Sequence, residues 1–583
     1  MAKNKVLVTS ALPYVNNVPH LGNLIGSVLS ADAFARFMRI DGNEVLFVLG
    51  TDEHGTTAEV KALEEGVTPR QLVDKYFIIH KSIYDWFETS YDCLGRTSSK
   101  ENAEITQHIF KKLYENGYIV EHTITQLYSE KSKKFLSDRF VEGECPYCHA
   151  SGARGDQCDA CGKLLEPTEL INPISKIDGT KPVMKETKHL YIDLPKIEPD
   201  LQAWYDTTKK KWSDVAINIT SQWLKQGLKE RCITRDLEWG VKIPLLGWEN
   251  KVFYSWFDAP IGYIGITIEN KPDSWKEWWM NKDVNLYQFM GKDNVPFHGI
   301  MFPAFLLGTK ENYKLVNYLA STDYLNYEDK KFSKSKSTGV FGDSAKETGI
   351  AVDIWRYYLF RIRPESGDSQ FEWNDFMMKV NNELVGNYGN FVNRVISLDE
   401  KYNELKKAKK NSNTLIEKIT PLVKEYQELF KQVRIKDALL KANEISSVGN
   451  KYLQDTAPWT LSKTDMPGAL SIIAECIDLC KILAVLYHPF TPNASEKVWG
   501  MLNESKPLLE VGIAGSFVEI EEGRQLAKEG ILFSKLEEKQ IAELKEKFAG
   551  APQSAGASKS AGTPQSTGKT DVVSSKPSLP KKN

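Results

Sequence analysis

The sequence predicts an α/β protein in which a doubly wound parallel sheet is followed by a separate α-helical domain. Three observations support this fold class. Patterns typical of strand, loop, helix and strand follow one another at the start of the chain. A cysteine-rich stretch then interrupts the α/β pattern. From Trp373 to about Phe548, apolar residues recur with the helical period and strand signals are few.

The first elements form a βαβ unit. The patterns indicate a strand over 5–10, a proline-containing loop over 11–19, a helix over 21–38 and a strand over 44–49. Such units build open Rossmann-type sheets, which bind ligands beyond the carboxyl ends of their strands. The segment His20–Asn23, with the sequence HLGN, is therefore expected at a helix amino end. Gly50–Gly55 is expected directly after a strand.

The remaining segments divide the chain further. Residues 118–235 are irregular, whereas strand-like segments at Val252–Trp256 and Asn285–Met290 complete the sheet. The final stretch of Ala, Gly, Ser, Pro and Lys lacks the apolar residues needed to fold. We expect two halves of the sheet domain (1–117 and 236–325), a connective insertion (118–235), a loop region (326–372), a helical domain (373–548) and a disordered tail (549–583).

Length and composition are those of a soluble multi-domain protein. The chain has 583 residues, whereas single hydrophobic cores stop growing at about 250 to 300. No run approaches the ~18 consecutive apolar residues of a membrane span, and Val6–Val8 is too short for the apolar region of a signal peptide. We therefore expect a cytoplasmic protein without a membrane partner. The formal net charge is -2, so any contact with nucleic acid must use local patches.

Four of the eight cysteines lie close together. Cys145 and Cys148 form one Cys-x-x-Cys pair, and Cys158 and Cys161 form a second. Four thiolates in this arrangement suit a tetrahedral structural Zn²⁺ in a zinc knuckle, with no open position for catalysis. The alternative is a set of reduced thiols or an occasional disulfide. We interpret His149 as a spectator, because four cysteines already complete the ligand shell.

Two further segments carry polar groups suited to a polyphosphate. A helix amino end collects partial positive charge, so His20 and Asn23 could both reach phosphates there, or they could be an ordinary cap and polar pair. Gly22 leaves room for a base against the backbone. Lys331 and Lys334 lie in the loop segment KFSKS and could oppose the charge that builds on the α-phosphate as pyrophosphate leaves. Alone, this segment could be a solvated basic loop.

Together, these two segments resemble the HIGH and KMSKS signatures of class I aminoacyl-tRNA synthetases. The chain departs from the consensus at Asn23, as eukaryotic and archaeal-type methionine enzymes do, and at Phe332, which replaces a packing residue. The resemblance implies catalytic roles for His20, Asn23, Lys331 and Lys334. It also implies that residues 326–372 hold the KMSKS-type loop and contact the tRNA stem.

Four collinear segments narrow the resemblance to the methionyl branch of that family. They begin at Ala11 (ALPY), Gly50 (GTDEHG), Trp256 (WFDAPIGY) and Gly291 (GKDN), and the match covers roughly residues 1 to 540. It implies a methionine pocket lined by Leu12, Tyr14, Asp52, Trp256, Ala259, Pro260, Tyr263 and His298, with Asp52 on the substrate ammonium. Aromatic and apolar walls suit a polarizable thioether.

The resemblance also implies the reaction and its cofactors. Methionine would attack the α-phosphate of ATP with Mg²⁺ support, and the methionyl group would pass from the adenylate to the 3′ end of initiator and elongator tRNA(Met). Gly291 and Asp293, at a strand's carboxyl end, would meet the ribose and adenine of ATP, although they could be a turn glycine and a capping aspartate. The predicted ATP-binding set is His20, Gly22, Asn23, Gly291, Asp293, Lys331 and Lys334.

The helical domain carries a candidate anticodon site. Asn390 and Arg394 lie four residues apart on one helix face, and Trp459 follows Ala457-Pro458 at an expected turn. Single-stranded bases are bound by stacking on aromatic or guanidinium planes. The resemblance assigns anticodon contacts to these three residues. Without it, an ordinary surface pair and a core tryptophan are the favoured explanation.

Two other functions remain open from the sequence. The chain could be a class I enzyme for another amino acid or a nucleotidyltransferase, or it could be a non-catalytic tRNA-binding or scaffold protein. The segment Trp256–Tyr263 argues against another amino acid, and the helical anticodon-type domain argues against a small nucleotidyltransferase. The intact His20, Asp52, Lys331 and Lys334 argue against a non-catalytic protein. The basic tail could touch tRNA weakly, join a multi-synthetase or tRNA-binding partner, or be an inert linker.

Overall fold

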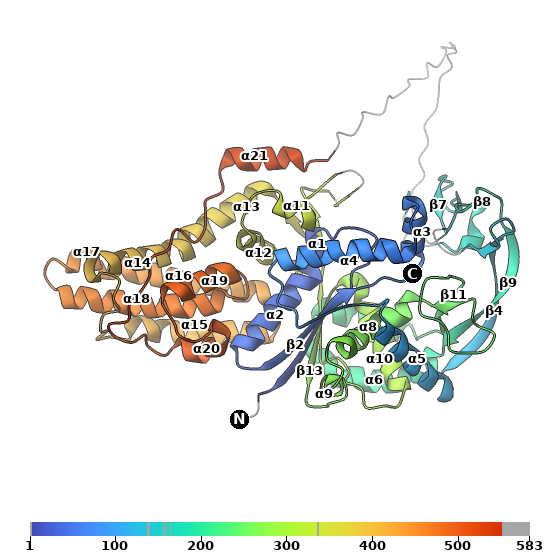
Figure 1. The fold of residues 1–583 in the computed structure, drawn as a ribbon, viewed down its shortest axis with the longest axis horizontal. Helices are drawn as coiled ribbons and strands as arrows, with labels where there is room; N and C mark the ends of the chain where they lie inside the picture. The colour runs from blue at the N-terminus through green and yellow to red at the C-terminus, as the bar shows by residue number, and fades with distance from the viewer. Residues whose placement is uncertain are drawn as a thin grey trace, which may run out of the picture.

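A computed structural model describes residues 3–550, except 137–139, 156–157, 159, 162, 164, 331 and 335–336. Figure 1 shows the parallel sheet in the middle of the molecule, the helical domain at one end and the insertion at the other. Within the described residues, no helix is long and apolar enough to cross a membrane.

A five-stranded parallel sheet forms the centre of the molecule. Its order is β14-β13-β1-β2-β3, with bounds Tyr318–Thr322, Asn285–Gly291, Lys5–Ser10, Glu44–Thr51 and Cys93–Arg96. Because β1 lies between β13 and β2, the sheet winds outward from β1 in both directions. The crevice at such a reversal of strand order is where α/β sheets bind ligands. The predicted doubly wound sheet is therefore confirmed.

The register explains how the two halves of the domain join. Val6 of β1 lies opposite Asn285 of β13 and Val45 of β2. Leu7 and Val8 are fully buried, as expected for a strand covered on both faces by helices. Residues after β1 and residues after β13 consequently emerge side by side, although about 280 positions separate them in the chain.

The helix predicted over 21–38 begins as expected but is not regular. It comprises a short helix α1 (Leu21–Asn23), a π-helical segment η1 (Leu24–Val28) and helix α2 (Leu29–Ile40). π-helical turns are rare and are frequent at functional sites. The irregularity directly follows HLGN.

The strand predicted at Val252–Trp256 is largely wrong. Only Val252–Phe253 is extended, as β12, and it pairs with β11 (Thr234–Arg235) rather than with the main sheet. Helix α8 (Ser255–Asn270) begins two residues later and contains Trp256. The helix forms because Phe257, Ile261 and Ile264 recur at helical spacing and are buried. A short apolar run does not distinguish these two structures.

The insertion consists of two small antiparallel sheets. The first has the order β10-β9-β4-β5, with bounds Arg231–Cys232, Val183–Ile192, Ile119–Ser129 and Lys134–Phe135. The second has the order β7-β6-β8, with bounds Ala153–Arg154, Val141–Glu144 and Ile171–Ser175. Helices α6 (Leu194–Thr208) and α7 (Asp214–Lys225) return the chain to the central domain.

The helical domain is confirmed. Its helices are α13 (Trp373–Lys379), η7 (Val380–Gly389), α14 (Asn390–Asn403), α15 (Thr414–Lys431), α16 (Ile435–Thr456), α17 (Pro458–Leu461), α18 (Met466–Tyr487), α19 (Pro492–Met501), α20 (Leu508–Ser516) and α21 (Glu538–Lys547). Helix α18 is buried on nearly all sides from Ile473 to Tyr487, which is typical of the central helix of a bundle. Trp459 lies in α17 rather than in the expected turn.

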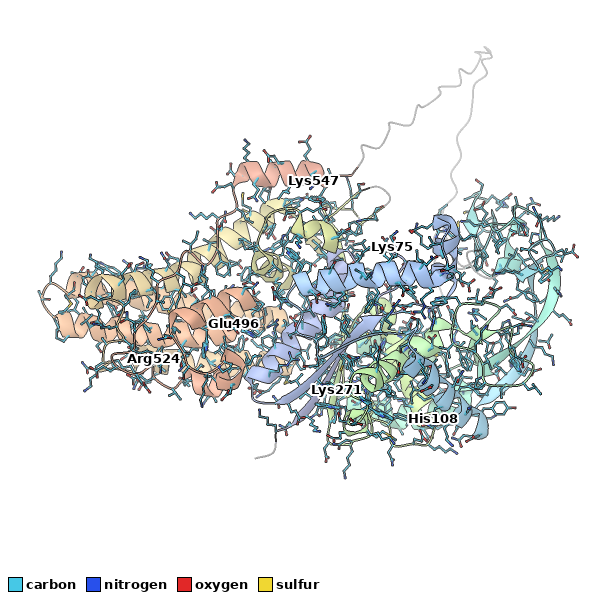
Figure 2. All side chains as sticks on the ribbon, viewed as in Figure 1. Lys75, His108, Lys271, Glu496, Arg524 and Lys547 are labelled. Atoms are coloured by element: carbon cyan, nitrogen blue, oxygen red, sulfur yellow. The ribbon has the colours of Figure 1, made fainter. Side chains whose placement is uncertain are left out.

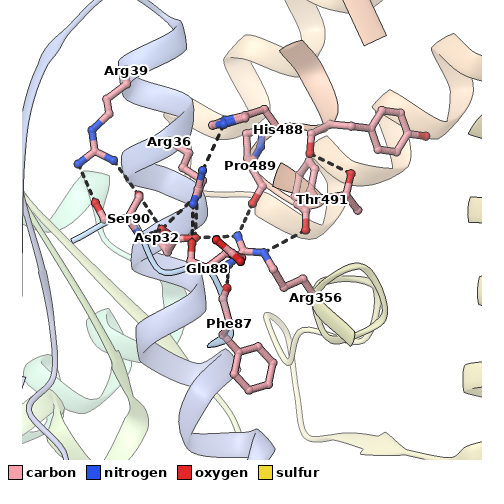
Figure 3. Close-up of polar contacts among 12 residues, drawn as sticks. Asp32, Arg36, Arg39, Phe87, Glu88, Ser90, Arg356, His488, Pro489 and Thr491 are labelled. Carbon is pink, nitrogen blue, oxygen red and sulfur yellow. Dashed lines mark hydrogen bonds and ion pairs between the residues drawn. The ribbon is translucent and has the colours of Figure 1, made fainter. Parts of the chain in front are cut away.

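A buried charge network joins the helical domain to the sheet domain (Figure 3). Arg356, on α12 (Val352–Arg361), is fully buried and pairs with Asp32 of α2 at 2.7 Å. Its guanidinium also donates to the carbonyl oxygens of Phe87, Pro489 and Phe490. One cation thus satisfies acceptors from segments on both sides of the domain boundary.

The Asp32 carboxylate is the anionic centre of this network. Arg36 lies 3.1 Å from it, and the Ser90 amide and hydroxyl both donate to it. Burial alone would raise the pKa of Asp32, but Arg36 and Arg356 hold this pKa well below its usual range. The network is therefore ionised at neutral pH.

Removing one member of this network should destabilise the protein. We expect Arg356→Met and Asp32→Asn each to lower the free energy of unfolding by about 3 to 5 kcal/mol, because each leaves a buried partner uncompensated. Because folding lowers the pKa of Asp32, its contribution is complete above the unfolded value of about 4 and is lost as the pH falls. Urea unfolding at pH 7 and at about pH 2, below the unfolded pKa, measures both effects.

The control is Glu104→Gln, which removes an exposed pair with Lys100 and should change stability little. The double variant Asp32→Asn, Arg356→Met should lose less than the sum of the single losses. Strictly additive losses would show that the two groups do not act as a unit.

Candidate active site

The HLGN segment caps the first helix at the sheet's switch point. The His20 Nδ1 atom accepts from the amides of Gly22 and Asn23 at 3.0 and 3.3 Å, and the Asn23 side chain accepts from the His20 amide at 3.1 Å. A side chain on Gly22 would meet the His20 ring at 2.8 Å, so the turn needs glycine. Burial lowers the pKa of His20 to about 4, which keeps the ring neutral.

The loop that carries KFSKS folds over this helix end. The ring of Phe332 stacks on the ring of His20 with centroids 4.6 Å apart, and Phe341 meets His20 edge-on. Phe332 is thus a packing residue, but it packs on the signature histidine itself. Ser333 pairs with Thr338 across a tight turn, which brings the two ends of the loop together.

Lys334 occupies an ion pair in this structure. Its Nζ atom lies 3.0 Å from the Asp343 carboxylate and 4.7 Å from the centre of the Phe341 ring. Asp343 lies at the start of α11 (Gly342–Lys346). The other predicted lysine, Lys331, lies outside the described residues.

The end of the helical domain holds the base of the same loop. The Gly339 amide donates to the Phe548 carbonyl at 3.0 Å, and Thr338 forms a β-bridge with Ala549. Lys545 of α21 pairs with Glu328 at 3.0 Å, and Lys547, labelled in Figure 2, pairs with Glu347 at 3.6 Å. Helix α21 therefore connects the loop to the domain that carries the anticodon candidates.

All eight residues predicted for the methionine pocket surround one small cavity. Its volume is about 40 Å³. The lining comprises the predicted Leu12, Tyr14, Asp52, Trp256, Ala259, Pro260, Tyr263 and His298, together with Ala11, Asn294 and Phe297. Leu12 and Tyr14 follow β1, whereas Asn294, Phe297 and His298 lie between β13 and helix α10 (Phe302–Gly308). The switch point therefore forms this cavity.

One end of the cavity carries a buried carboxylate. Asp52 directly follows strand β2 and is 4% exposed. Burial, and then the nearby Asp258, raise its pKa well above the ordinary value. Asp258 is itself paired with the His54 Nδ1 atom at 2.6 Å. Of these two carboxylates, Asp52 has no cationic side chain within salt-bridge distance among the described residues. An incoming cation would therefore pair with Asp52.

The other end carries a neutral histidine with a defined tautomer. The His298 Nδ1 atom lies 2.9 Å from the Asn294 carbonyl, which can only accept, so Nδ1 carries the proton. Nε2 then accepts from the Tyr263 hydroxyl at 2.8 Å. Burial lowers the pKa of His298 to about 4. Trp256 and Tyr14 are half-exposed at the cavity mouth, where the Trp256 indole donates to the Tyr14 hydroxyl.

Gly291 and Asp293 lie at the carboxyl end of β13, as predicted. A side chain on Gly291 would meet no other atom within 4 Å, so packing alone does not explain the glycine. Asp293 accepts a hydrogen bond from the Tyr324 hydroxyl. The neighbouring Lys292 pairs with Asp323 at 2.8 Å and with Asp368 at 3.1 Å.

The four clustered cysteines meet in the smaller sheet of the insertion. Their sulfur atoms all lie within 4.8 Å of one another, which is the arrangement of ligands around one tetrahedral ion. His149 instead pairs with Glu144 at 2.7 Å, in agreement with its interpretation as a spectator.

The three anticodon candidates also lie together, on a different domain. Asn390 and Arg394 both donate to the Asn450 side-chain oxygen at 3.4 Å. The Arg394 guanidinium lies 5.6 Å from the centre of the Trp459 ring. These contacts bring α14, α16 and α17 to one patch.

Sequence reasoning did not find several residues of these sites. Phe297 and Asn294 line the small cavity, Asp343 holds Lys334, and Asn450 holds Arg394. The available signal was that Asn294 is the last residue of GKDN and that Phe297 follows it by three positions. No local pattern marks Asp343 or Asn450, since each is identified only by a contact across the fold.

Comparison with known proteins bears directly on this arrangement. Residues 6–396 match the family model described as tRNA synthetases class I (M). Residues 404–553 match the model described as the anticodon binding domain of methionyl tRNA ligase. The chain has the fold of the Mycobacterium tuberculosis methionyl-tRNA synthetase solved with methionyl-adenylate, with a TM-score of 0.75 and 22% identity over 91% of this chain and 99% of that one.

Curated relatives are closer in sequence. A probable cytoplasmic methionine–tRNA ligase of Dictyostelium discoideum is 47% identical over 94% of this chain and 76% of that protein. The Borreliella afzelii methionine–tRNA ligase is 48% identical over 94% of this chain and 75% of that protein. The human cytoplasmic enzyme is 46% identical over 94% of this chain, which spans 62% of that protein. The chain therefore belongs to the methionine–tRNA ligase family of class I tRNA synthetases, as its sequence motifs indicated.

Proposed function

We propose that the chain activates methionine with ATP to methionyl-adenylate and transfers the methionyl group to tRNA(Met). The observation that carries this proposal is the small cavity at the switch point. It has a buried carboxylate at one end, a Tyr263–His298 pair at the other and aromatic rings between them. The HLGN helix end follows the same strand, β1, as the lining residues Leu12 and Tyr14.

The cavity suits methionine at each of its ends. Asp52 would bind the ammonium group, because a cation restores the charge that burial disfavours. Trp256 and Phe297, with ring centroids 4.6 Å apart, would pack against the side chain, and thioether sulfur interacts favourably with ring edges. With its proton on Nδ1, His298 holds the Tyr263 hydroxyl in one direction and so fixes the polar end of the pocket.

Adenylate formation would be a matter of positioning and charge. The methionine carboxylate attacks the α-phosphate of ATP, and pyrophosphate leaves. Lys334 would exchange Asp343 for the phosphates, and His20 and Asn23 would turn from capping toward them. Lys331 would act with Lys334, and Gly22, Gly291 and Asp293 would hold the base and ribose. Mg²⁺ bound to ATP would offset phosphate charge.

Transfer would use the rest of the molecule. The terminal ribose hydroxyl of tRNA attacks the methionyl carbonyl, and AMP leaves. Asn390, Arg394 and Trp459 would bind the anticodon by stacking and base-edge contacts. The cysteine cluster fits one Zn²⁺, with Cys145, Cys148, Cys158 and Cys161 as ligands that stabilise the insertion. We further propose a cytoplasmic location. The tail that could contact a partner protein lies beyond residue 550, outside the described part of the chain.

Purified protein should catalyse ATP–pyrophosphate exchange with methionine and with no other standard amino acid. Lys334→Ala should lower kcat for exchange by about 10²- to 10³-fold, the usual effect of removing one donor to transition-state charge. The KM for methionine should change little, because Lys334 lies outside the cavity lining.

The matched control is Lys61→Ala. It removes a surface lysine that is paired with Glu64 of its own helix, α3 (Thr56–Glu65), and that lies outside the KFSKS loop. Exchange with a different amino acid would refute the pocket assignment. Absence of exchange with every amino acid would favour a non-catalytic tRNA-binding or scaffold protein.

Metal analysis should find about one zinc per chain. Cys145→Ala and Cys161→Ala should each abolish it, since each removes one of four ligands. Cys93→Ala, which alters a buried cysteine of the main sheet, should retain the metal. Stoichiometric zinc in both cluster variants would refute the four-thiolate site.

Trp459→Ala should weaken tRNA binding and spare the adenylate step. Loss of one stacking platform costs about 1 to 3 kcal/mol, so the KM for tRNA(Met) should rise by roughly 5- to 150-fold while methionine-dependent exchange is unchanged. Trp275→Ala, in the distant helix α9 (Trp275–Trp279), is the control. Equal effects of the two substitutions would contradict an anticodon role.

A further inference from the structure

One exposed tyrosine lies among the three segments that we propose to bind ATP. Tyr324 lies between β14 and the short strand β15 (Leu325–Tyr327), and β15 leads into the KFSKS loop. The Tyr324 hydroxyl donates to Asp293 of GKDN. The carbonyl oxygen of the next residue, Leu325, would lie 3.3 Å from a side chain on Gly22 of HLGN. Tyr324 is therefore adjacent to all three segments, although none of them includes it.

The strand register brings Tyr324 to Asp293. Gly291 of β13 lies opposite Thr322 of β14 in the parallel sheet. Asp293 lies two residues after Gly291, and Tyr324 lies two residues after Thr322. Residues that follow parallel strands emerge at the same edge of a sheet, where such sheets bind ligands. The two side chains therefore meet at the ligand-binding edge.

The backbone of Tyr324 is held on both sides. Its amide donates to the Asp368 carboxylate at 3.0 Å, and its carbonyl oxygen accepts from the Ser369 amide at 2.9 Å. Ser369 begins β16 (Ser369–Phe371), which pairs with β15. The Tyr324 side chain therefore projects from a fixed point of the fold.

A cation holds the ring of Tyr324. The Lys292 Nζ atom lies 4.1 Å from the centre of this ring, an arrangement in which an ammonium is attracted to an aromatic face. Lys292 is itself held by its ion pairs with Asp323 and Asp368. Tyr324 nevertheless remains 43% exposed. The ring is thus restricted in orientation while a ligand can still approach it.

The hydroxyl of Tyr324 restricts the Asp293 carboxylate in turn. Asp293 is exposed in the short helix η5 (Lys292–Asn294), where a side chain without a partner would sample several rotamers. Its Oδ1 atom accepts from Tyr324, whereas its Oδ2 atom has no hydrogen-bond donor among the described residues. Partial burial and the bond to Asp293 raise the pKa of Tyr324 to about 12, so the hydroxyl is a donor at neutral pH. Oδ2 is therefore available to a ligand in one orientation.

We propose that Tyr324 is a positioning residue for the ribose of ATP, because it orients the Asp293 carboxylate so that Oδ2 accepts from a ribose hydroxyl. This inference rests on the proposed function, in which Asp293 binds ATP. An ionised carboxylate has about four acceptor sites, so the ribose need not displace Tyr324. A site that bonds a substrate hydroxyl rejects analogues that lack it. Tyr324 thereby contributes to the selection of a ribonucleotide.

The opposite role would have the opposite sign. If the Tyr324 hydroxyl instead occupied the place of a ribose hydroxyl, it would compete with ATP, and its removal would strengthen ATP binding. If it orients Asp293, its removal weakens ATP binding. The free Oδ2 atom favours orientation over competition.

The test compares ATP with 2′,3′-dideoxyATP, which lacks both ribose hydroxyls. Calorimetry on the full-length protein measures Kd for each nucleotide. Tyr324→Phe should raise Kd for ATP by about three- to tenfold, the usual effect of one hydrogen bond. It should leave Kd for 2′,3′-dideoxyATP unchanged, because the ring over Lys292 is kept. In the Asp293→Ala background, Tyr324→Phe should have no further effect, because the two residues act through one contact.

The matched control is Tyr318→Phe, which removes a hydroxyl bonded to Gln432 at the other end of β14 and should change neither Kd. Equal weakening of both nucleotides by Tyr324→Phe would show a general structural effect and overturn the proposal. Tighter binding of ATP, or no change in either Kd, would also overturn it.

Pyrophosphate exchange provides a second measurement. Tyr324→Phe should raise the KM for ATP by the same factor and change kcat and the KM for methionine by less than about twofold, as expected for a contact made equally before and during reaction. A fall in kcat at unchanged KM would overturn the positioning role. Absence of exchange in the wild-type protein would refute the synthetase assignment, whereas calorimetry would still decide the role of Tyr324, so the two failures are distinguishable.

Discussion

The parallel pairing of β1 with β13 is the constraint on which the rest of the molecule depends. It joins two chain segments that the insertion separates, with Val6 opposite Asn285. The ladder continues past the strand end, where the Ala11 amide donates to the Phe289 carbonyl at 2.8 Å. Six residues of the small cavity follow these two strands, whereas Asp52 follows β2 and the other four belong to helix α8. Leu12 and Tyr14 leave one strand as Asn294 and His298 leave the other, so a slip in register would remove the pocket.

The second constraint is that the signature groups already have partners. His20 caps its own helix and stacks on Phe332, and Lys334 is paired with Asp343. A bound triphosphate must therefore compete with contacts of the protein itself. Each of these contacts is exposed or partly exposed and individually weak, so their exchange for phosphate oxygens needs little free energy. Phe548 and Ala549 meanwhile hold the loop base at Thr338 and Gly339, which restricts the exchange to the loop tip.

The sequence predicted those parts of the molecule that depend on local pattern. The helix start at His20, the strand before Gly50 and the Cys-x-x-Cys pairs follow from spacing, capping and turn chemistry, and the structure contains them. The strand expected at Val252–Trp256 was wrong, because a short apolar run fits a strand and a buried helix equally well. The helical environment of Trp256 depends on burial of Phe257 and Ile261, which only the packed fold reveals.

Other features could not have been predicted from local pattern at all. The Arg356 network joins residues more than three hundred positions apart, and nothing near Asp32 in the sequence identifies its partner. The position of Cys232 opposite Tyr191 likewise depends on the register between β9 and β10. The pocket residues are an intermediate case between these two groups. Their resemblance to the family motifs predicted which residues form the set, but their convergence around one cavity depends on the sheet.

Two buried carboxylates show how the fold prepares the charged end of the pocket. Burial raises the pKa of both Asp52 and Asp258, and the Asp258 charge raises that of Asp52 further. His54 offsets this at Asp258 through a 2.6 Å contact. The remaining electrostatic repulsion raises the pKa of Asp52, which lies at the cavity wall. A substrate ammonium would relieve that repulsion and favour the ionised form of Asp52. Binding of the amino group would therefore be stabilised, because it removes an unfavourable interaction that is present in the free protein. The aromatic walls are then left to discriminate among side chains, for which methionine's length and polarizable sulfur are the distinguishing features.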